Sequence, residues 1–340
     1  MGLRDIAERA GVSIATVSRF LRDRELVSVE SRRKIEQALG ELQYPPQKRK
    51  YYRKRDKIIV LFVPDIENPF FASTVKNMDL FLSRMGYLSI PCNMWENGDL
   101  ETRYLRLLKR YSAEGILLIP SGKRIEEFLQ RLLKECPLPV VVFDRRLEGF
   151  PLPFVGCDNH EGGKLAAKHL LQMGRRNIAF IAGKDGVSTS AERLQGYKEA
   201  LEEAGFGFRK EFVIKGDFSF QSGFEAGKQI LAMKEKIDGV FAANDFMALG
   251  LLECFKRSGV RVPDDISVVG YDDIWAGRVC EPPLTTVRQP ISEMCEFAAN
   301  AIVRFAQGEE ITPFERVFKP ELVVRGSSYF PLEGGEKRGV

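Results

Sequence analysis

The first apolar positions of the chain recur at helical spacing. Leu3, Ile6, Ala7 and Ala10 fall on one face of a short helix. Gly11 follows that face and can end the helix, because glycine adopts the positive φ of a helix C-cap without a steric penalty. The pattern therefore predicts a short amphipathic helix that is closed by a glycine turn.

A second helical pattern follows the turn. Ser13 can cap this helix, whose inner face is formed by Val17, Phe20 and Leu21. Two short amphipathic helices around a tight glycine turn are typical of a helix-turn-helix, whose second helix can enter a DNA major groove. The alternative is an ordinary helical hairpin of a larger domain, but the basic segment that follows favours DNA binding.

A third helix is predicted over residues 28–42. Its apolar stripe should pack on the first two helices, and it consists of Val29, Ile35, Ala38, Leu39 and Leu42. Pro45 and Pro46 then stop the helical pattern, because proline lacks a backbone N–H and restricts the residue before it. Residues 1–46 are therefore predicted to form a helix-turn-helix DNA-binding headpiece.

From residue 58 onward, apolar runs alternate with helical stretches. The predicted strands cover residues 58–63, 88–91, 115–119, 140–143, 178–182, 240–242 and 267–270, with a last strand near 322–325. The predicted helices cover residues 72–85, 100–111, 125–134, 160–173, 191–204, 221–234 and 246–259. Continuous apolar strands that alternate with helices indicate parallel sheets with both faces covered. We therefore expect two doubly wound parallel sheets, one before about Asp158 and one after it.

Two parts of the sequence resemble a known family. The segment AERAGVSIATVSRFL closely resembles the N-terminal headpiece of the LacI/GalR family of bacterial repressors. The order of strands and helices after residue 58 is similar to the periplasmic-binding-protein-like body of those regulators. The resemblance extends to about Ser328, and it implies an all-α helix-turn-helix headpiece plus an α/β two-lobed body.

These patterns set the expected domain boundaries. The headpiece covers residues 1–46, a basic linker or hinge covers 47–57, the sugar-binding and dimerisation body covers 58–328, and a tail covers 329–340. Within the body, the N-lobe is expected at about 58–157 and 290–318, and the C-lobe at about 158–289 and 319–328.

Charge is distributed unevenly along the chain. Residues 1–57 contain 15 Lys and Arg and 8 Asp and Glu, whereas the remainder contains 36 and 39. A basic head on a mildly acidic body predicts that a polyanion binds to the N-terminal part alone. Together with the helix-turn-helix, the family resemblance implies that this partner is double-stranded operator DNA. The family's hinge helix should carry a leucine that wedges into the minor groove, but no leucine lies between Tyr44 and Ile58. Tyr51 or Tyr52 could act as the wedge in its place.

Other protein classes are not supported. No apolar run approaches eighteen residues, and a charged amphipathic helix stands where a signal peptide would lie, so we expect a cytoplasmic protein that does not bind membranes. The six cysteines, at positions 92, 136, 157, 254, 280 and 295, form no CxxC pair, and no histidine is placed to complete a metal cluster. We therefore expect buried free thiols, no metal site and no cofactor.

Polar and aromatic side chains gather where the predicted strands end. In an open parallel sheet, ligands bind at the carboxyl ends of the strands. Asp and Asn suit the vicinal hydroxyls of a sugar, Arg donates in a fixed fork, and aromatic faces stack on a sugar ring. The candidate ligand-binding residues, with Arg193 expected to open a helix, are Asn68, Phe70, Phe71, Asp144, Arg145, Arg193, Phe218, Asn244, Asp272 and Gln289.

Each of these positions alone is typical of a turn or a helix cap, but so many at the ends of successive elements favour a binding site. Their order and types are similar to the ribose pocket of ribose-binding proteins and ribose repressors. The resemblance therefore implies a small sugar effector, and we expect D-ribose. Asp144, Asp158 and Asp272 could instead be the acid and base of a glycosidase, but the sequence contains no HExxH or GxSxG motif, and we expect no enzymatic activity.

The DNA-reading residues are expected on the second helix. The resemblance places base-edge contacts at its start, where Ile14 and Ala15 lie, and Arg19 one turn later can bind both O6 and N7 of guanine. The candidate DNA-binding residues, phosphate contacts included, are Ser13, Ile14, Ala15, Thr16, Ser18, Arg19, Arg22, Ser28, Tyr51 and Tyr52. Because one headpiece reads only a half-site, we expect a homodimer on a palindromic operator.

Together these features predict a transcriptional repressor whose operator affinity is controlled by a sugar bound between the lobes. Alternatives from other classes stay open: a different sugar or a purine as effector, control by a protein partner, a pure sugar-binding transport protein, or a sugar-processing enzyme. The sequence does not decide whether the effector is an inducer or a corepressor. No heptad run follows the body to favour a tetramer.

Overall fold

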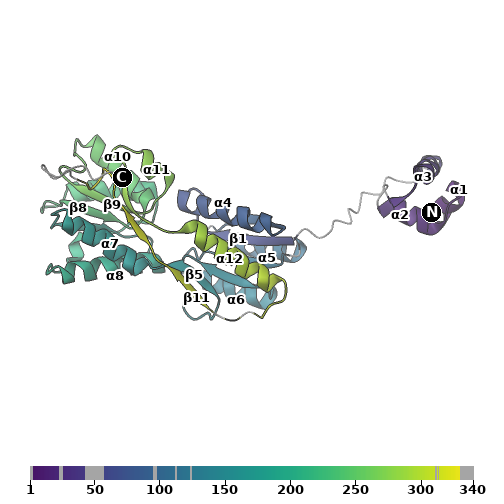
Figure 1. The fold of residues 1–340 in the computed structure, drawn as a ribbon, viewed down its shortest axis with the longest axis horizontal. Helices are drawn as coiled ribbons and strands as arrows, with labels where there is room; N and C mark the ends of the chain where they lie inside the picture. The colour runs from purple at the N-terminus through teal and green to yellow at the C-terminus, as the bar shows by residue number, and fades with distance from the viewer. Residues whose placement is uncertain are drawn as a thin grey trace. The chain divides into compact units, whose positions relative to one another are not determined.

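The computed structural model of the chain contains two units, Met1–Asp56 and Lys57–Val340 (Figure 1). It describes residues 3–22, 26–42, 57–94, 98–111, 113–122, 125–310, 312 and 314–329. Nearly all of the expected linker and most of the expected tail lie outside the described residues.

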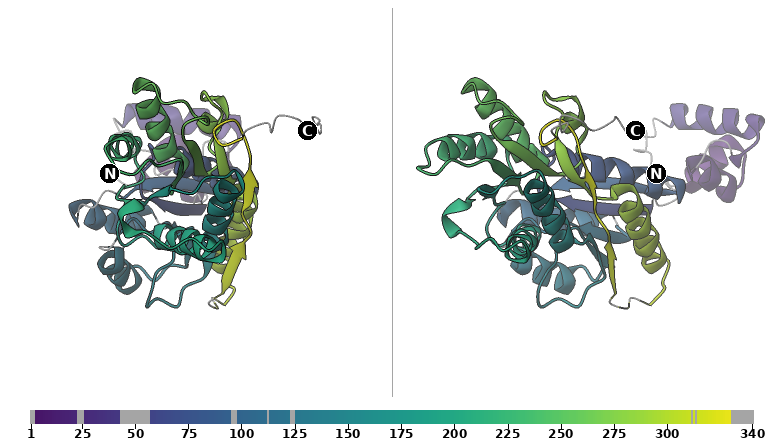
Figure 2. Two further views of the ribbon diagram at one scale, coloured as in Figure 1. Left: turned by 90° about the vertical axis from the view of Figure 1, so that its left-hand side faces the viewer. Right: turned by 60° about the vertical axis from the view of Figure 1, so that its left-hand side comes forward.

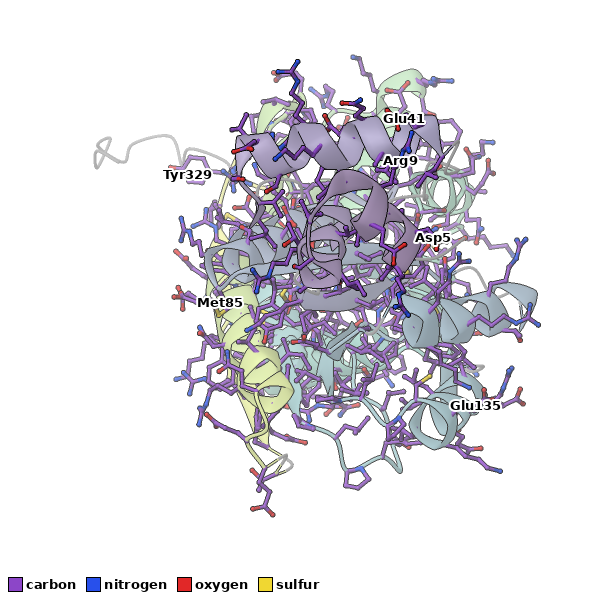
Figure 3. All side chains as sticks on the ribbon, turned by 90° about the vertical axis from the view of Figure 1, so that its right-hand side faces the viewer. Asp5, Arg9, Glu41, Met85, Glu135 and Tyr329 are labelled. Atoms are coloured by element: carbon purple, nitrogen blue, oxygen red, sulfur yellow. The ribbon has the colours of Figure 1, made fainter. Side chains whose placement is uncertain are left out.

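The described part of the first unit contains three helices, namely α1 (Leu3–Ala10), α2 (Ile14–Arg22) and α3 (Val29–Glu41). The turn between α1 and α2 is made by Gly11, which has the expected positive φ of 63°. The helices enclose a small apolar core that includes Ile6, Val17, Phe20 and Ile35. At the surface, Nε of Arg9 in α1 donates to Oε2 of Glu41 in α3 at 2.6 Å (Figure 3).

One residue of the predicted stripe on α3 does not face this core. Val29 is 79% exposed. It occupies the first position of α3, directly after the N-cap Ser28, whose side chain accepts a hydrogen bond from the backbone N–H of Ser31. Because the first turn of the helix extends beyond the core, the buried contact is made further along by Ile35 and Ala38.

The second unit contains two six-stranded sheets (Figure 1, Figure 2). The first has the order β11-β5-β4-β3-β1-β2 and is parallel throughout. Its strands are β1 (Lys57–Val63), β2 (Tyr87–Asn93), β3 (Gly115–Leu118), β4 (Val140–Phe143), β5 (Phe154–Cys157) and β11 (Glu315–Phe318). The second has the order β12-β10-β9-β8-β6-β7 and is parallel except for β12, which is antiparallel to β10. Its strands are β6 (Ile178–Ile181), β7 (Val213–Ile214), β8 (Gly239–Ala242), β9 (Ser267–Asp272), β10 (Thr285–Arg288) and β12 (Glu321–Val323).

Helices cover both faces of each sheet and complete two lobes. The first lobe carries α4 (Pro69–Arg84), α5 (Gly98–Tyr111), α6 (Ile125–Glu135) and α12 (Ile291–Ala306). The second lobe carries α7 (Asn159–Gln172), α8 (Ser188–Glu203), α9 (Phe220–Leu231), α10 (Asp245–Arg257), the short α11 (Trp275–Val279) and a 3₁₀ turn at Lys210–Phe212. The chain crosses between the lobes three times: after β5, after β10 and after β11.

Burial explains why the central strands were readable from the sequence. The strands β3, β4, β6 and β8 are four-residue apolar runs in which every residue is buried, as expected of parallel strands covered on both faces. The cysteines are free thiols, five of them buried and Cys280 half-buried. Among the described residues, no helix combines the length and apolar character that crossing a membrane requires.

Candidate functional sites

The ten candidate ligand-binding residues, here called the strand-end cluster, lie where strands of both sheets end. Asp144 and Arg145 directly follow β4, Asp272 is the last residue of β9, and Gln289 directly follows β10. All ten residues are buried, with exposed fractions between 1% and 8%. Four of them carry a charge, and a buried charge needs partners to offset its lost hydration.

Arg145 connects the two lobes inside this cluster. Its guanidinium carbon lies 5.1 Å from the ring centre of Phe71 in the first lobe and 5.4 Å from that of Phe218 in the second. Its Nη1 donates to the carbonyl oxygen of Pro120 at 2.9 Å, and its Nε lies 3.7 Å from Oδ2 of Asp144. One cation thus contacts an aromatic ring from each lobe and a buried carboxylate.

Arg193 occupies the second-lobe half of the cluster. Its Nε donates to Oδ1 of Asn159 at 2.9 Å, and its Nη1 donates to the carbonyl oxygen of Ala243. Its Nη2 lies 3.8 Å from Oδ1 of Asp272, and its guanidinium carbon lies 3.6 Å from the ring centre of Tyr271. These contacts fix the guanidinium in one orientation with one face on an aromatic ring.

The prediction that Arg193 opens a helix is wrong. The helix α8 begins at Ser188, so Arg193 is its sixth residue. The first turn contains the buried polar residues Thr189 and Ser190, and the hydroxyl of Ser190 accepts a hydrogen bond from the backbone N–H of Gly183 at 2.8 Å. A buried polar turn of this kind is invisible to a search for apolar periodicity.

Two asparagines of the cluster also act as helix caps. Oδ1 of Asn68 accepts from the backbone N–H of Phe70 at 3.0 Å, and Oδ1 of Asn244 accepts from that of Met247 at 3.0 Å. Nδ2 of Asn244 in turn donates to the carbonyl oxygen of Phe218 at 3.1 Å. Both asparagines of the cluster therefore have the capping role that is typical of such positions.

Backbone strain concentrates in the cluster. Among the described residues, four non-glycine residues have a φ in the left-handed region, and three belong to the cluster: Asp144 at 66°, Phe218 at 73° and Asp272 at 114°. The fourth is Asp273, the next residue along the chain, at 54°. Such conformations cost on the order of 1–3 kcal/mol each and are typical of functional sites.

Three buried polar atoms of the cluster have no hydrogen-bond partner within the described part of the chain. They are Oδ1 of Asp144, Nε of Arg145 and Oε1 of Gln289. The amide of Gln289 is oriented by its other atom, since Nε2 donates to Oδ1 of Asp272 at 2.9 Å. An unsatisfied buried group costs about 1–3 kcal/mol, so the cluster is suited to a ligand with both donors and acceptors.

Burial shifts the ionisation of the charged residues. It raises the pKa of Asp144, although the cations of Arg145 and Arg193 oppose the shift. It raises the pKa of Asp272 to about 7, opposed by Arg193 and by the hydrogen bond from Gln289. It also lowers the pKa of Arg145 to about 10. The charges in the cluster therefore depend on one another.

The second helix of the first unit presents the predicted DNA-reading side chains on its outer face. Ile14 is 49% exposed, and Ala15 and Arg19 are also exposed. Val17 and Phe20 lie on the opposite face and are buried in the three-helix core. The start of α2 is thus free of core contacts.

Polar candidates flank this face. Oγ of Ser13 accepts from the backbone N–H of Thr16 at 3.1 Å, and the two hydroxyls lie 2.8 Å apart, so both belong to the helix cap. Ser18 is half-buried, and Ser28 caps α3. The side chain of Arg22 and the whole of Tyr51 and Tyr52 lie outside the described residues.

Comparison with known proteins agrees with both units. Residues 2–47 match the model of the bacterial regulatory proteins of the lacI family, and residues 167–328 match that of a periplasmic binding protein-like domain. A ribose operon repressor of Halalkalibacterium halodurans is 33% identical over 336 residues, an alignment that covers 98% of each chain. The chain belongs to the lacI family. It is a DNA-binding transcriptional regulator with a headpiece and a two-lobed, periplasmic-binding-protein-like body, as the sequence predicts.

Other members of the lacI family match over most of their length. The HTH-type transcriptional repressor PurR of Photobacterium profundum is 35% identical over 330 residues, which are 96% of this chain and 98% of the relative. A solved complex of the transcriptional regulator CelR with cellobiose superimposes with a TM-score of 0.74 at 33% identity, covering 96% and 99% of the two chains. A LacI family regulator from Enterococcus faecium with bound ribose superimposes with a TM-score of 0.72 at 29% identity. The match covers 80% of this chain and 98% of that regulator. These relatives are named as regulators, not as enzymes.

The strand-end cluster of this lacI-family chain includes neighbours that sequence reasoning did not select. Asn159 holds Arg193 in place, and Tyr271 supports its guanidinium from one face. Both follow the rule that found the others, since Asn159 lies two residues after β5 and Tyr271 lies near the end of β9. Their roles depend on contacts with Arg193, which is distant from both in the sequence.

Proposed function

We propose that this regulator is a repressor whose operator affinity is controlled by D-ribose bound to the strand-end cluster. The observation that carries the proposal is the set of three buried atoms on Asp144, Arg145 and Gln289 that have no hydrogen-bond partner among the described residues. Two are acceptors and one is a donor. A pentose suits this set, because each sugar hydroxyl both donates and accepts.

The aromatic residues support the same ligand class. The rings of Phe71 and Phe218 approach the guanidinium of Arg145 from the two lobes, and such rings can cover the apolar C–H face of a sugar. The ribose operon repressor and the ribose-bound regulator among the relatives support ribose in particular. The CelR–cellobiose complex makes another sugar the main competitor.

Control of DNA binding would act through the relation between the lobes. Arg146 lies shortly after β4 in the first lobe and contacts the second lobe twice. Its backbone N–H donates to Oγ of Ser188 at 2.9 Å, and its side-chain Nε lies 3.5 Å from Oε1 of Glu192. A sugar held by both lobes would strengthen such contacts and shift the population of lobe arrangements. By linkage, the factor by which ribose changes operator affinity equals the factor by which operator changes ribose affinity.

The DNA-binding form would be a homodimer. Trp275 and Val279 lie four residues apart on α11 and are 67% and 72% exposed, which makes an apolar face on the second lobe. Exposed apolar faces of this kind are typical of protein interfaces. We propose that this face joins two copies of the chain, so that two headpieces read the half-sites of one operator with Ile14, Ala15 and Arg19.

A ligand screen tests the proposal. Melting temperatures are measured with D-ribose, other pentoses, hexoses, cellobiose, nucleosides and purine bases. A ligand at 100 times its Kd stabilises the folded state by about 2.7 kcal/mol, so a rise with D-ribose alone is expected. Operator titration with and without the stabilising ligand then gives the sign of the response. A rise with another compound would replace ribose as the effector, and no rise with any compound would favour control by a protein partner.

A further inference from the structure

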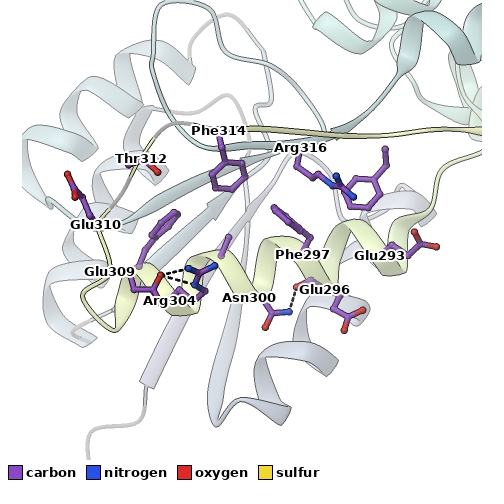
Figure 4. Close-up of a pocket in the computed structure, with 13 residues that line it drawn as sticks. Glu293, Glu296, Phe297, Asn300, Arg304, Glu309, Glu310, Thr312, Phe314 and Arg316 are labelled. Carbon is purple, nitrogen blue, oxygen red and sulfur yellow. Dashed lines mark hydrogen bonds and ion pairs between the residues drawn. The ribbon is translucent and has the colours of Figure 1, made fainter.

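A groove on the first lobe lies apart from the strand-end cluster. It runs between α12 and β11, has a volume of about 460 Å³, and is lined by both elements and by the segment that joins them (Figure 4). The size is within the range of about 300–1,000 Å³ that is usual for ligand sites. None of the residues that line it belongs to the strand-end cluster.

Aromatic rings form the floor of the groove. Phe297 of α12 is 38% exposed, and its ring centre lies 5.6 Å from that of Phe314 and 6.3 Å from that of Phe318. Figure 4 shows the side chain of Phe297 directed from α12 toward Phe314, which directly precedes β11. Exposed aromatic faces attract cations.

The groove already holds a cation of its own chain. The guanidinium carbon of Arg316 lies 4.9 Å from the ring centre of Phe318 and 5.7 Å from that of Phe297. Arg316 is exposed on β11. Arg316 therefore covers part of the aromatic floor, and its removal would leave these faces to an apolar side chain of a partner.

Carboxylates stand at both ends of this floor. Glu293 and Glu296 lie at one end, and Glu309 and Glu310 lie at the other (Figure 4). Glu309 pairs with Arg304 at 2.6 Å. Within the described residues, neither Glu293 nor Glu296 forms an ion pair, so both carboxylates at that end can bind an incoming cation.

The spacing of the charged ends favours a polypeptide over a small ion. An α-helix rises 1.5 Å per residue, so α12 separates Glu293 from Arg304 and its partner Glu309 by roughly 17 Å. An extended chain covers that length with about five to six residues, at 3.3 Å each. We propose that the groove binds a basic segment of a partner protein, with cationic side chains at both ends and an apolar centre.

The test uses the full chain and a fluorescein-labelled peptide of sequence KRLFLRK as the probe, followed by fluorescence anisotropy. Glu296→Lys and Phe297→Ser are each expected to weaken binding at least fivefold. Glu202→Lys, the same charge change at an exposed position of α8, should leave binding unchanged. Arg316→Ala is expected to tighten binding about threefold, since it frees the aromatic faces. The probe KRSGSRK, which keeps the charges and lacks the apolar centre, should bind at least tenfold more weakly.

Several results would overturn the proposal. Equal binding of KRLFLRK to the wild type, Glu296→Lys and Phe297→Ser, or equal affinity for the two peptides, would reduce the interaction to general charge attraction. Spermine that bound as tightly and depended on Glu296 in the same way would assign the groove to a small organic cation. A loss of self-association in Phe297→Ser without any probe, measured by sedimentation, would make the groove an interface between copies of this chain. Circular dichroism confirms that each variant is folded.

Discussion

The guanidinium carbon of Arg145, in the first lobe, lies 5.4 Å from the ring centre of Phe218, in the second lobe. Both residues are buried. The two lobes therefore meet at the strand-end cluster, and a ligand bound there as proposed would contact both at once. The proposed site would thus connect ligand binding to the arrangement of the lobes.

Asp144→Asn tests the unpaired acceptor of the cluster. The change keeps the size of the side chain and removes the charge that faces Arg145. A hydrogen bond to a charged group contributes about 1.5–3 kcal/mol, so ribose affinity measured by calorimetry should fall roughly 10- to 100-fold, while operator binding without sugar is kept. Asp185→Asn, at an exposed position of the second lobe, is the control and should bind ribose as the wild type does.

Asp272 should make the stability of the sugar-free protein depend on pH. Burial raises its pKa to about 7 in the folded state, whereas the unfolded chain has the ordinary value near 3.8. Its contribution to stability is therefore fully present below about pH 4 and is lost as the pH rises toward 7. Asp272→Asn removes this loss, so the melting temperature of the variant relative to the wild type should be higher at pH 8 than at pH 5. Between these two pH values, the free energy of unfolding of the variant relative to the wild type should rise by about 1–4 kcal/mol, since one pKa unit equals about 1.4 kcal/mol. A difference that is the same at both pH values would contradict the assignment.

Gly183→Ala should disturb the cluster by displacing the ring of Phe218. A Cβ atom at position 183 would come within 2.0 Å of the Phe218 ring, so the ring must move. Overpacking of this kind costs about 1–3 kcal/mol, and the displaced ring should weaken ribose binding as well as lower the melting temperature. Gly207→Ala is the matched control, because a Cβ there meets nothing within 4 Å. Unchanged ribose affinity in Gly183→Ala would remove Phe218 from the proposed site.

Arg19→Ala should weaken operator binding and relax its specificity. A bidentate contact between an arginine and guanine contributes about 1–3 kcal/mol of discrimination, so affinity for the cognate site should fall roughly 5- to 150-fold and selectivity at one base position should disappear. Arg33→Ala removes an exposed cation from α3. It should lower the affinity for every DNA sequence by the same factor, and this factor should be smaller than the loss that Arg19→Ala causes at the cognate site. Electrophoretic mobility shifts on operators with single-base changes separate the two outcomes. Retained base selectivity in Arg19→Ala would place the readout elsewhere on α2.

Trp275→Asp should separate the proposed dimer. Burying an unpaired carboxylate at the centre of an apolar interface is strongly unfavourable, so sedimentation should give monomers at concentrations where the wild type is a dimer, and operator affinity should fall with the loss of the second headpiece. Leu231→Asp places the same charge on α9 at a residue that is 41% exposed. If both variants remain dimers, the interface lies on another face.

The headpiece and the central strands could be predicted because their signals are local. The caps at Gly11 and Ser13 and the buried run of β4 each depend on adjacent residues. The strands β7, with two residues, and β11, with an exposed pattern, carry no such signal. The strand β10 contains Thr285 and Thr286, which are polar and therefore do not form an apolar run in the sequence. Both are nevertheless fully buried, because their hydroxyl groups form hydrogen bonds inside the protein.

The strand-end cluster was predictable for a different reason. Parallel strands bring their carboxyl ends to the same edge of a sheet, so the order of elements places Asp144 at this edge of the first sheet and places Asp272 and Gln289 at this edge of the second. Their individual contacts could not be predicted, since Arg193 is held by Asn159 from α7 and by Ala243 from the end of β8. Those partners are fixed by tertiary packing and leave no periodic trace in the chain.

The three crossings between the lobes have a consequence for how the protein is made. The first sheet is completed only by β11, at residues 315–318, and its helix layer only by α12. Long-range pairing of this kind forms slowly, and during synthesis it must wait until most of the chain has left the ribosome. The three helices of the headpiece, by contrast, draw their core from the first 42 residues. A nascent chain thus completes the unit that recognises DNA hundreds of residues before the body that regulates it.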